Sequence, residues 1–325
     1  MCARFLSVRM KLTSFVFVPS SFFQLCPAAK ALFGFPLNMD PESDEMKGNR
    51  RFLAHAAYMI EMLDRALNML GPDVELLQEI LSDRECFDCH ELEIPHAFPK
   101  LTTFYVYCCV TILVGKKHAR MGVREAYFPF MGEALIETLR ETLGNSFFTP
   151  EVEQSWHLVY GGLSTAMIQA MNSEAAVLNS WAKLKTVPEY DKIAGTKLFQ
   201  FLFRKCPEAK TLFGFPLDLD MDSEVMMKSR RFQMHAKHFI DMLDKAIGMV
   251  EAKQIEQNMK ELGELHVCFG VKASYFPIMG EGLLLALSET LPEEDWNSDI
   301  KAAWNNVYDR LSSSMISAMK QSERK

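Results

Sequence analysis

The sequence predicts an all-α protein in which one helical unit occurs twice in tandem. Apolar residues recur at steps of three and four along most of the chain, and no strand-like alternation competes with this pattern. In addition, "CPAAKALFGFPLNMD", which begins at Cys26, returns in the second half of the chain as "CPEAKTLFGFPLDLD", which begins at Cys206. Internal repeats of this kind indicate a duplicated structural unit.

The spacing between the two copies changes part-way through the unit. The segment "GKKHARMGVREAYFPFMGEAL" from Gly115 matches "GELHVCFGVKASYFPIMGEGL" from Gly263, which is a shorter separation than that between Cys26 and Cys206. The first copy therefore carries an insertion at about residues 82–113. We expect domain 1 to span residues 20–172 and domain 2 to span residues 176–325, joined by a short segment that favours a helix.

Domain 1 is expected to be incomplete at its N-terminal end. Only a short stretch precedes its repeated segment, so its first helix is predicted to be absent and its second to be compromised. Each copy then contains a short turn that begins at a proline and ends in "LFGF", where the first phenylalanine is Phe33 or Phe213.

The next helix of each copy has a histidine within its apolar face. Residues 50–67, "RRFLAHAAYMIEMLDRAL", match residues 230–247, "RRFQMHAKHFIDMLDKAI". The apolar positions fall at steps of three and four, so they share one face of a helix with His55 or His235.

A second histidine occurs in the apolar stripe of a later helix. In domain 2 this histidine is His266, and in domain 1 it is His118, which the insertion separates further from His55 along the chain. A Gly-Val pair follows each stripe and is expected to end the helix. The stripes comprise Ile255, Met259, Leu262, His266 and Phe269 in domain 2, and Val114, His118 and Met121 in domain 1.

Two further helices complete domain 2. The first has a proline, Pro277, that fits its first turn. The apolar stripes are Phe276, Met279, Leu283, Leu287 and Leu291 in the first helix, and Ile300, Trp304, Tyr308, Leu311, Met315 and Met319 in the second.

Paired histidines in apolar stripes favour a shared ligand between the two helices. A single such residue would be read as a core imidazole bonded to a backbone carbonyl, but here the pair occurs in both copies. Zinc is poorly supported, because neither histidine has a cysteine or carboxylate on its own stripe. Haem iron fits better, because it needs a neutral imidazole on one side, a polar group or second imidazole on the other, and apolar, aromatic walls.

The second copy resembles a globin over nearly its whole length. The resemblance rests on Trp181, "GTKLFQFLFRKCPEAKTLFGF", "FQMHAKHFIDMLD", "LGELHVCFGV" and Trp304. With its first copy, the chain is similar to a tandem two-domain globin in the style of the neuroglobin and cytoglobin branch. This resemblance implies two tandem globin-fold domains, each packed around a haem, the first lacking its N-terminal helix and carrying the insertion before its proximal helix.

For domain 2, the resemblance implies that His266 is the proximal ligand of the iron. His235 would be the distal histidine, with the alternative that it also binds the iron. The remaining residues implied to contact haem in this domain are Phe199, Phe213, Phe239 and Val271.

For domain 1, the resemblance implies His118 as the proximal iron ligand and His55 as the distal histidine. Phe33, Met59 and Val123 would contact the haem. Pro19 stands where domain 2 has Phe199, which is a departure from the family's pattern.

The resemblance implies one or two haem b groups per chain and reversible binding of O2, NO or CO, in an oxygen carrier, a sensor or a scavenger. In the resting state, the iron would have either a free coordination position or both histidines as ligands. An enzyme is the less expected alternative. A nitric oxide dioxygenase or a peroxidase would need a separate reductase, because the chain has no G-x-G-x-x-G motif. A haem-free helical interaction module is a third alternative.

Charge and hydropathy limit the remaining partners. The net charge is −7 without a basic run, which argues against nucleic acid. No window reaches the roughly 18 apolar residues of a membrane span. We expect a cytoplasmic protein, although the N-terminal "MCARFLSVRMKLTSFVFVPSSFF" weakly resembles a signal peptide. The sequence does not predict an oligomeric state.

The insertion contains "CFDCH" (residues 86–90), which has the C-x-x-C-H spacing of covalent haem attachment. Metal binding or redox chemistry by these cysteines is a second interpretation. We favour a plain surface insertion, which would bulge outward as a loop before the proximal helix of domain 1.

Overall fold

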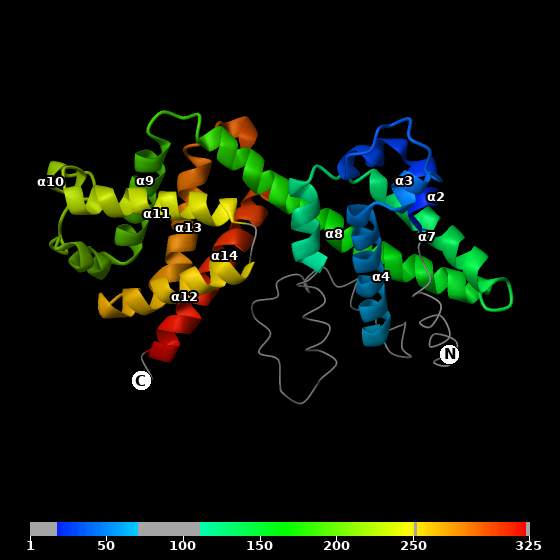
Figure 1. Ribbon diagram of the computed structural model, residues 1–325. Coiled ribbons are helices and arrows are strands. Elements are labelled where there is room, and N and C mark those ends of the chain that lie inside the picture. The colour runs from blue at the N-terminus through cyan, green and yellow to red at the C-terminus, as the bar shows by residue number, and fades with distance from the viewer. Residues whose placement is uncertain (1–17, 71–110, 250–251, 323–325) are drawn as a thin grey trace. The chain divides into compact units, whose positions relative to one another are not determined.

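The computed structural model describes residues 18–70, 111–249 and 252–322 (Figure 1). All the regular secondary structure in these three ranges is helical, so the all-α prediction is confirmed. The chain divides into two compact units, with the boundary between Asn172 and Ser173. This boundary lies inside helix α8 (Pro150–Leu184), within the join between the two sequence copies. The expectation that each copy is a domain of its own stays a prediction.

Some sequence predictions concern residues outside these ranges. The signal-like segment is described only from residue 18 onward, and the "CFDCH" motif lies entirely outside the described residues. The insertion is described only from residue 111 onward. Among the helices that the structure describes, none combines the length and the apolar character needed to cross a bilayer.

Unit 2 contains the end of α8 and the helices that follow it. In chain order these are α9 (Tyr190–Lys205), η3 (Pro207–Phe213), α10 (Glu224–Met227), α11 (Arg230–Gly248), α12 (Ala252–Cys268), α13 (Tyr275–Ser288), η4 (Glu293–Asp295) and α14 (Ser298–Ser322). Helix α9 packs against both α11 and α13, while α12 packs against α14 (Figure 1). His235 therefore lies on α11 and His266 on α12.

In the residues that the structure describes, unit 1 follows the same order. Its elements are α2 (Val18–Leu25), η1 (Pro27–Phe33), α3 (Asp44–Lys47), α4 (Arg50–Leu70), a helix over residues 111–120, α7 (Tyr127–Leu143) and the first part of α8. Helix α2 packs against α7. His55 lies on α4, and His118 lies in the helix over residues 111–120.

The histidine helices begin and end where the sequence predicts. Asn49 and Ser229 accept hydrogen bonds from the backbone N–H groups of Phe52 and Phe232, which caps the starts of α4 and α11. The helices that carry His118 and His266 end at Gly122 and Gly270, whose φ angles are +77° and +75°. This left-handed conformation favours glycine, so the predicted helix stops are confirmed.

Two members of the predicted proximal stripes do not belong to the core. Met121 is 52% exposed and Phe269 is 64% exposed. Each lies immediately before the terminating glycine, where the chain turns away from the helix axis. Assigning them to the buried stripe was therefore wrong, because helical periodicity stops predicting a shared face once the helix ends.

The proximal helix of each unit lies very close to the last helix of that unit. A Cβ atom at Gly263 would lie 2.6 Å from the backbone oxygen of Met315, and one at Gly115 would lie 2.6 Å from that of Met167. Only glycine permits this approach. This close contact fixes the position of each helix one turn before its histidine, His266 or His118.

A third close approach occurs in unit 2. A Cβ atom at Gly195 on α9 would lie 2.4 Å from the backbone oxygen of Ala236 on α11. When Cys26 is aligned with Cys206, the first copy has Phe15 in the position of this glycine. A phenylalanine does not fit so close a crossing, which gives a physical reason to expect a different second helix in the first copy.

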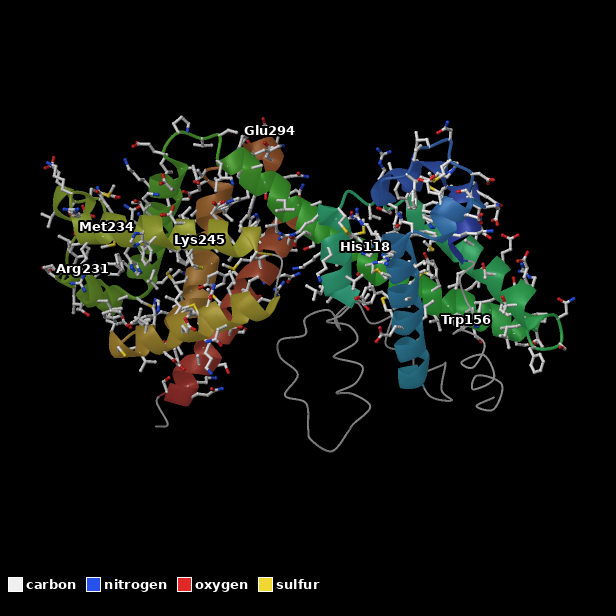
Figure 2. The ribbon with its side chains drawn as sticks, in the orientation of Figure 1. His118, Trp156, Arg231, Met234, Lys245 and Glu294 are labelled. Carbon is white, nitrogen blue, oxygen red and sulfur yellow. The ribbon has the colours of Figure 1, made fainter. Side chains whose placement is uncertain are left out.

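The buried tryptophans also distinguish the units. Trp304 donates its indole N–H to Ser180 Oγ over 2.9 Å, which ties α14 to the end of α8. Trp156, the counterpart of Trp304 in unit 1, is also buried. Its position is labelled in Figure 2. Its indole N–H has no hydrogen-bond partner among the described residues. Within the described part of unit 1, nothing replaces the acceptor that the first helix supplies in unit 2.

We predict that Ser180→Ala lowers the free energy of unfolding by about 1–3 kcal/mol, because the buried N–H of Trp304 loses its acceptor. Ser288→Ala is the matched control, since the Ser288 hydroxyl is exposed and bonds within its own helix. Urea denaturation followed by tryptophan fluorescence measures both variants. Equal stability of the two variants would contradict the importance of this hydrogen bond.

Candidate functional site

The two predicted proximal histidines have the same anchoring. The Nδ1 atom of His266 lies 2.7 Å from the carbonyl oxygen of Leu262, and that of His118 lies 2.7 Å from the carbonyl oxygen of Val114. With Nδ1–H donating to this carbonyl, the lone pair of Nε2 is free to bind a metal. The anchor lies one turn earlier on the same helix, so it does not depend on the segment of the predicted insertion.

The backbone of the same histidines also takes part in the helix cap. The N–H groups of Val123 and Val271 donate to the carbonyl oxygens of His118 and His266, at 3.0 and 3.2 Å. This is the hydrogen bond expected of a helix that ends in a left-handed glycine. In each of these two predicted proximal histidines, local hydrogen bonds therefore hold both the ring and the backbone carbonyl.

In unit 2 the predicted distal histidine lies between aromatic rings. The ring centroid of His235 lies 5.2 Å from that of Phe199 and 5.2 Å from that of Phe213, both edge-on. Phe199 also contacts Phe239 at 6.2 Å. The structure thus brings together four of the residues that the sequence analysis selected for this site.

The surroundings of His235 favour its neutral form. Desolvation by the surrounding protein and the charge of His266 are the two main causes that lower the pKa of His235 to about 4. The residue nevertheless keeps access to solvent. At neutral pH, His235 therefore presents a neutral ring that solvent can reach.

In unit 1 the two histidines contact each other. The ring centroids of His55 and His118 lie 5.9 Å apart, and Phe33 lies 5.3 Å from His55. Burial and the charge of His118 lower the pKa of His55. Burial also lowers the pKa of His118, although its hydrogen bond to Val114 acts in the opposite direction. Both rings are therefore expected to be neutral at pH 7.

This donor set fits an iron porphyrin. Two imidazoles on opposite sides of one metal ion, each at about 2 Å, have ring centroids about 6 Å apart, which is close to the spacing in unit 1. Phe33 and Met59 in unit 1, and Phe213 and Val271 in unit 2, are half-buried apolar side chains at these sites. No three histidine, cysteine or carboxylate side chains gather as a metal site within the described ranges.

Sequence reasoning missed several residues that shape these sites. Phe128 lies 6.4 Å from His118, and Phe276 lies 6.2 Å from His266. Phe22, Phe52 and Met131 line a cavity next to His55. The "YFP" motif shared by the two copies was a signal for Phe128 and Phe276. Nothing in the sequence pointed to Phe22.

A buried lysine in each unit positions the predicted haem-stacking phenylalanine, and it was also missed. Lys210 Nζ donates to the carbonyl oxygens of Leu217 and Leu219, at 2.8 and 2.9 Å. Lys30 makes the same two bonds in unit 1, to the carbonyl oxygens of the residues aligned with these leucines, Leu37 and Met39. A buried cation requires such partners. These bonds hold the loop that follows the phenylalanine.

Comparison with known proteins agrees with this geometry. The family model for globins matches residues 113–167 and 196–315. The chain belongs to the globin family. The matched residues include both histidines that were predicted to be proximal, so the globin fold and a haem cofactor follow from the family.

Three curated relatives are similar to about half of this chain. Two are anaerobic nitrite reductases from Gossypium hirsutum: the first is 30% identical over 151 residues (45% of this chain, 91% of the relative), and the second is 31% identical over 150 residues (45% of this chain, 88% of the relative). An anaerobic nitrite reductase from Casuarina glauca is 30% identical over 153 residues (46% of this chain, 91% of the relative). A single copy in this globin therefore has roughly the length of a whole relative.

We predict that Lys210→Met lowers the melting temperature of this globin, because the carbonyls of Leu217 and Leu219 lose their buried donor. The expected loss of stability is about 1–3 kcal/mol. Lys228→Met is the control, since Lys228 forms an exposed ion pair with Glu224, and such pairs contribute little. Circular dichroism during heating measures both. A Lys210→Met protein as stable as the control would contradict the role of this lysine.

Proposed function

We propose that this globin binds O2 or another diatomic gas, NO or CO, reversibly at two haem b groups, one in each unit. His266 and His118 serve as proximal ligands, and His235 and His55 lie on the distal side. The observation that supports this most strongly is the shared anchoring of the proximal rings. In both units Nδ1 is bonded to a carbonyl of the same helix, which leaves Nε2 available.

Bound haem supplies the iron atom that takes up the gas. The chain orients and protects this group. The carbonyls of Leu262 and Val114 fix the tautomer and direction of the proximal rings. On the distal side of unit 2, His235 is neutral at pH 7 and has one N–H to donate to a polarised ligand. The rings of Phe199 and Phe239 limit the access of water.

Direct binding of the iron by the distal histidine is the proposed resting state of unit 1. The support is the ring contact between His55 and His118, whose 5.9 Å spacing suits two ligands of one metal. An external gas would then have to compete with His55. In unit 2, the ring contact between Phe199 and His235 supports a different arrangement, in which His235 stays beside a bound gas.

Reduction of nitrite is a second candidate, supported by the names of the three plant relatives. Conversion of nitrite to nitric oxide takes up one electron and two protons and releases water. An external reductant, such as a separate reductase, must supply the electron. Anaerobic release of nitric oxide from nitrite by the reduced protein, measured with an electrode, tests this activity. Nitric oxide dioxygenase activity requires the same kind of partner.

We predict that the full chain binds two equivalents of haem, and that His266→Ala and His118→Ala each remove one of them. The reason is that each substitution deletes a single proximal ligand. Titration of the Soret absorption band measures the stoichiometry, and His157→Ala is the control because His157 is exposed. The absence of a Soret band after haem addition would favour a haem-free interaction module instead.

We further predict sharp visible bands in the reduced protein before any gas is added, owing to the bis-histidine site of unit 1. His55→Val should remove the share of these bands that unit 1 contributes, since valine cannot bind iron. His238→Val is the control, because His238 is exposed. A reduced spectrum that is identical in all three proteins would show that His55 is not an iron ligand.

A further inference from the structure

In each unit, a tyrosine of the last helix forms a hydrogen bond to the start of the preceding helix. The hydroxyl of Tyr308 on α14 donates to the carbonyl oxygen of Phe276, in the first turn of α13, over 2.8 Å. The hydroxyl of Tyr160 on α8 donates to the carbonyl oxygen of Phe128, in the first turn of α7, over 2.7 Å. The two units therefore share this bond as well as the anchoring of their histidines.

Each tyrosine ring reaches its carbonyl across a glycine. A Cβ atom at Gly280 would lie 2.8 Å from Cδ1 of Tyr308, and one at Gly132 would lie 2.7 Å from Cε1 of Tyr160. Each glycine lies one helical turn after the phenylalanine that accepts the bond. Burial raises the pKa of both phenols, so each hydroxyl stays protonated and remains a donor. Ring and hydroxyl together hold the first turn of α13 and of α7.

The phenylalanine in each of these bonds packs against the proposed proximal histidine. The ring centroid of Phe276 lies 6.2 Å from that of His266, and the centroid of Phe128 lies 6.4 Å from that of His118. The bond from Nδ1 to a carbonyl of its own helix is a single contact, so the imidazole can still tilt about it. A neighbouring aromatic ring limits this tilt, because aromatic pairs prefer offset or edge-to-face arrangements.

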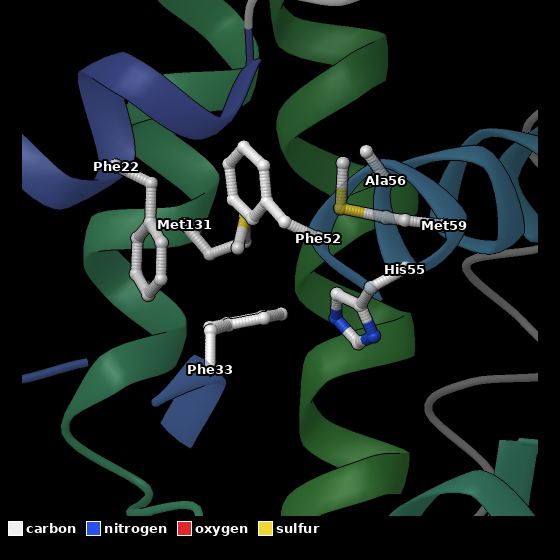
Figure 3. A pocket seen from close by; sticks show the side chains of 7 residues that line it. All are labelled: Phe22, Phe33, Phe52, His55, Ala56, Met59 and Met131. Atoms are coloured by element: carbon white, nitrogen blue, oxygen red, sulfur yellow. The ribbon is translucent and has the colours of Figure 1, made fainter. Parts of the chain in front are cut away.

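In unit 1 the helix that Tyr160 holds also borders the second histidine. Met131 lies on α7, next to the glycine at residue 132 that the Tyr160 ring covers. The Met131 side chain lines a cavity beside His55, together with side chains from α2, η1 and α4 (Figure 3). The first turn of α7 therefore contacts His118, and its second turn borders the space next to His55.

We propose that Tyr308 and Tyr160 are positioning residues for the proposed proximal histidines of this globin. Each acts through its phenylalanine: the hydroxyl holds the first turn of α13 or α7, and the phenyl ring then sets the tilt of the imidazole and the direction of its Nε2. This role rests on the proposed function, because only bound haem gives the direction of Nε2 a consequence. The contacts themselves do not require haem.

A merely structural role for these hydroxyls is the alternative, and a neighbouring hydrogen bond supplies the control. Ser180 accepts the indole N–H of Trp304, which lies one turn before Tyr308 on α14. Ser180→Ala therefore removes a buried hydrogen bond of the same helix that does not involve Phe276. It shows what a loss of stability alone does to the histidine signals.

NMR of the histidine rings tests the proposal. The full chain is labelled with ¹³C at histidine Cε1, and His266→Ala and His118→Ala assign the two signals. Tyr308→Phe should shift the His266 signal and leave the His118 signal in place, because phenylalanine keeps the ring but loses the donor. Tyr160→Phe should do the converse, and Ser180→Ala should move neither signal.

A double-mutant cycle shows whether the hydroxyl acts through the phenyl ring. In a Phe276→Leu chain, Tyr308→Phe should cause no further shift of the His266 signal. The same shift in both backgrounds overturns the proposal, as does a His266 signal that Tyr308→Phe leaves in place. If circular dichroism shows that Tyr308→Phe does not fold, the same cycle with Tyr160→Phe and Phe128→Leu decides the question on the His118 signal.

Haem loading separates this proposal from the proposed function. In the ferric chain with bound cyanide, the NMR shifts of the haem methyl groups depend on the orientation of the proximal imidazole plane. Tyr308→Phe should change these shifts, and Ser180→Ala should not. A shifted His266 signal without haem uptake would support the positioning of the ring and contradict the proposed function. Haem uptake with unshifted His266 and haem methyl signals would do the reverse.

Discussion

The hydrogen bond between an imidazole, proposed as the proximal ligand, and a carbonyl of its own helix is the interaction on which both proposed sites depend. It links His266 to Leu262 and His118 to Val114 at the same distance. Because donor and acceptor are one helical turn apart, this bond forms wherever the helix forms. A glycine one turn before each histidine then sets the helix against the last helix of its unit. The same hydrogen bond and the same close helix contact are thus present in both units.

The distal side is built differently, and it is here that the two units diverge. Phe199 reaches His235 from α9, and the closeness of α9 to α11 depends on Gly195. The first copy has Pro19 and Phe15 at these two positions, so its sequence lacks both the phenylalanine and the glycine. Side chains that meet from several helices are more sensitive to substitution than a bond within one turn. The two units can therefore share the anchoring of His118 and His266 while the surroundings of His55 and His235 differ.

The sequence was sufficient to predict the fold class and the family, because helical periodicity, helix-ending glycines and a repeated motif are all local signals. It was misleading at Met121 and Phe269, whose spacing continues a stripe past the end of the helix. It did not reveal Phe22, because the contact of this residue with the distal site depends on how helices pack. The roles of the histidines stay proposals, since they require the bound cofactor. The insertion stays a prediction, as most of it lies outside the described residues.

Lys30 and Lys210 have a consequence for the order of folding. Each ammonium group bonds to two carbonyls that lie only a short distance further along the chain. Closing a loop of about ten residues takes on the order of 10–100 ns, far less than bringing distant helices together. The loop after each phenylalanine can therefore close before the rest of the unit has formed. Each copy therefore has its own local means of holding the segment next to its phenylalanine.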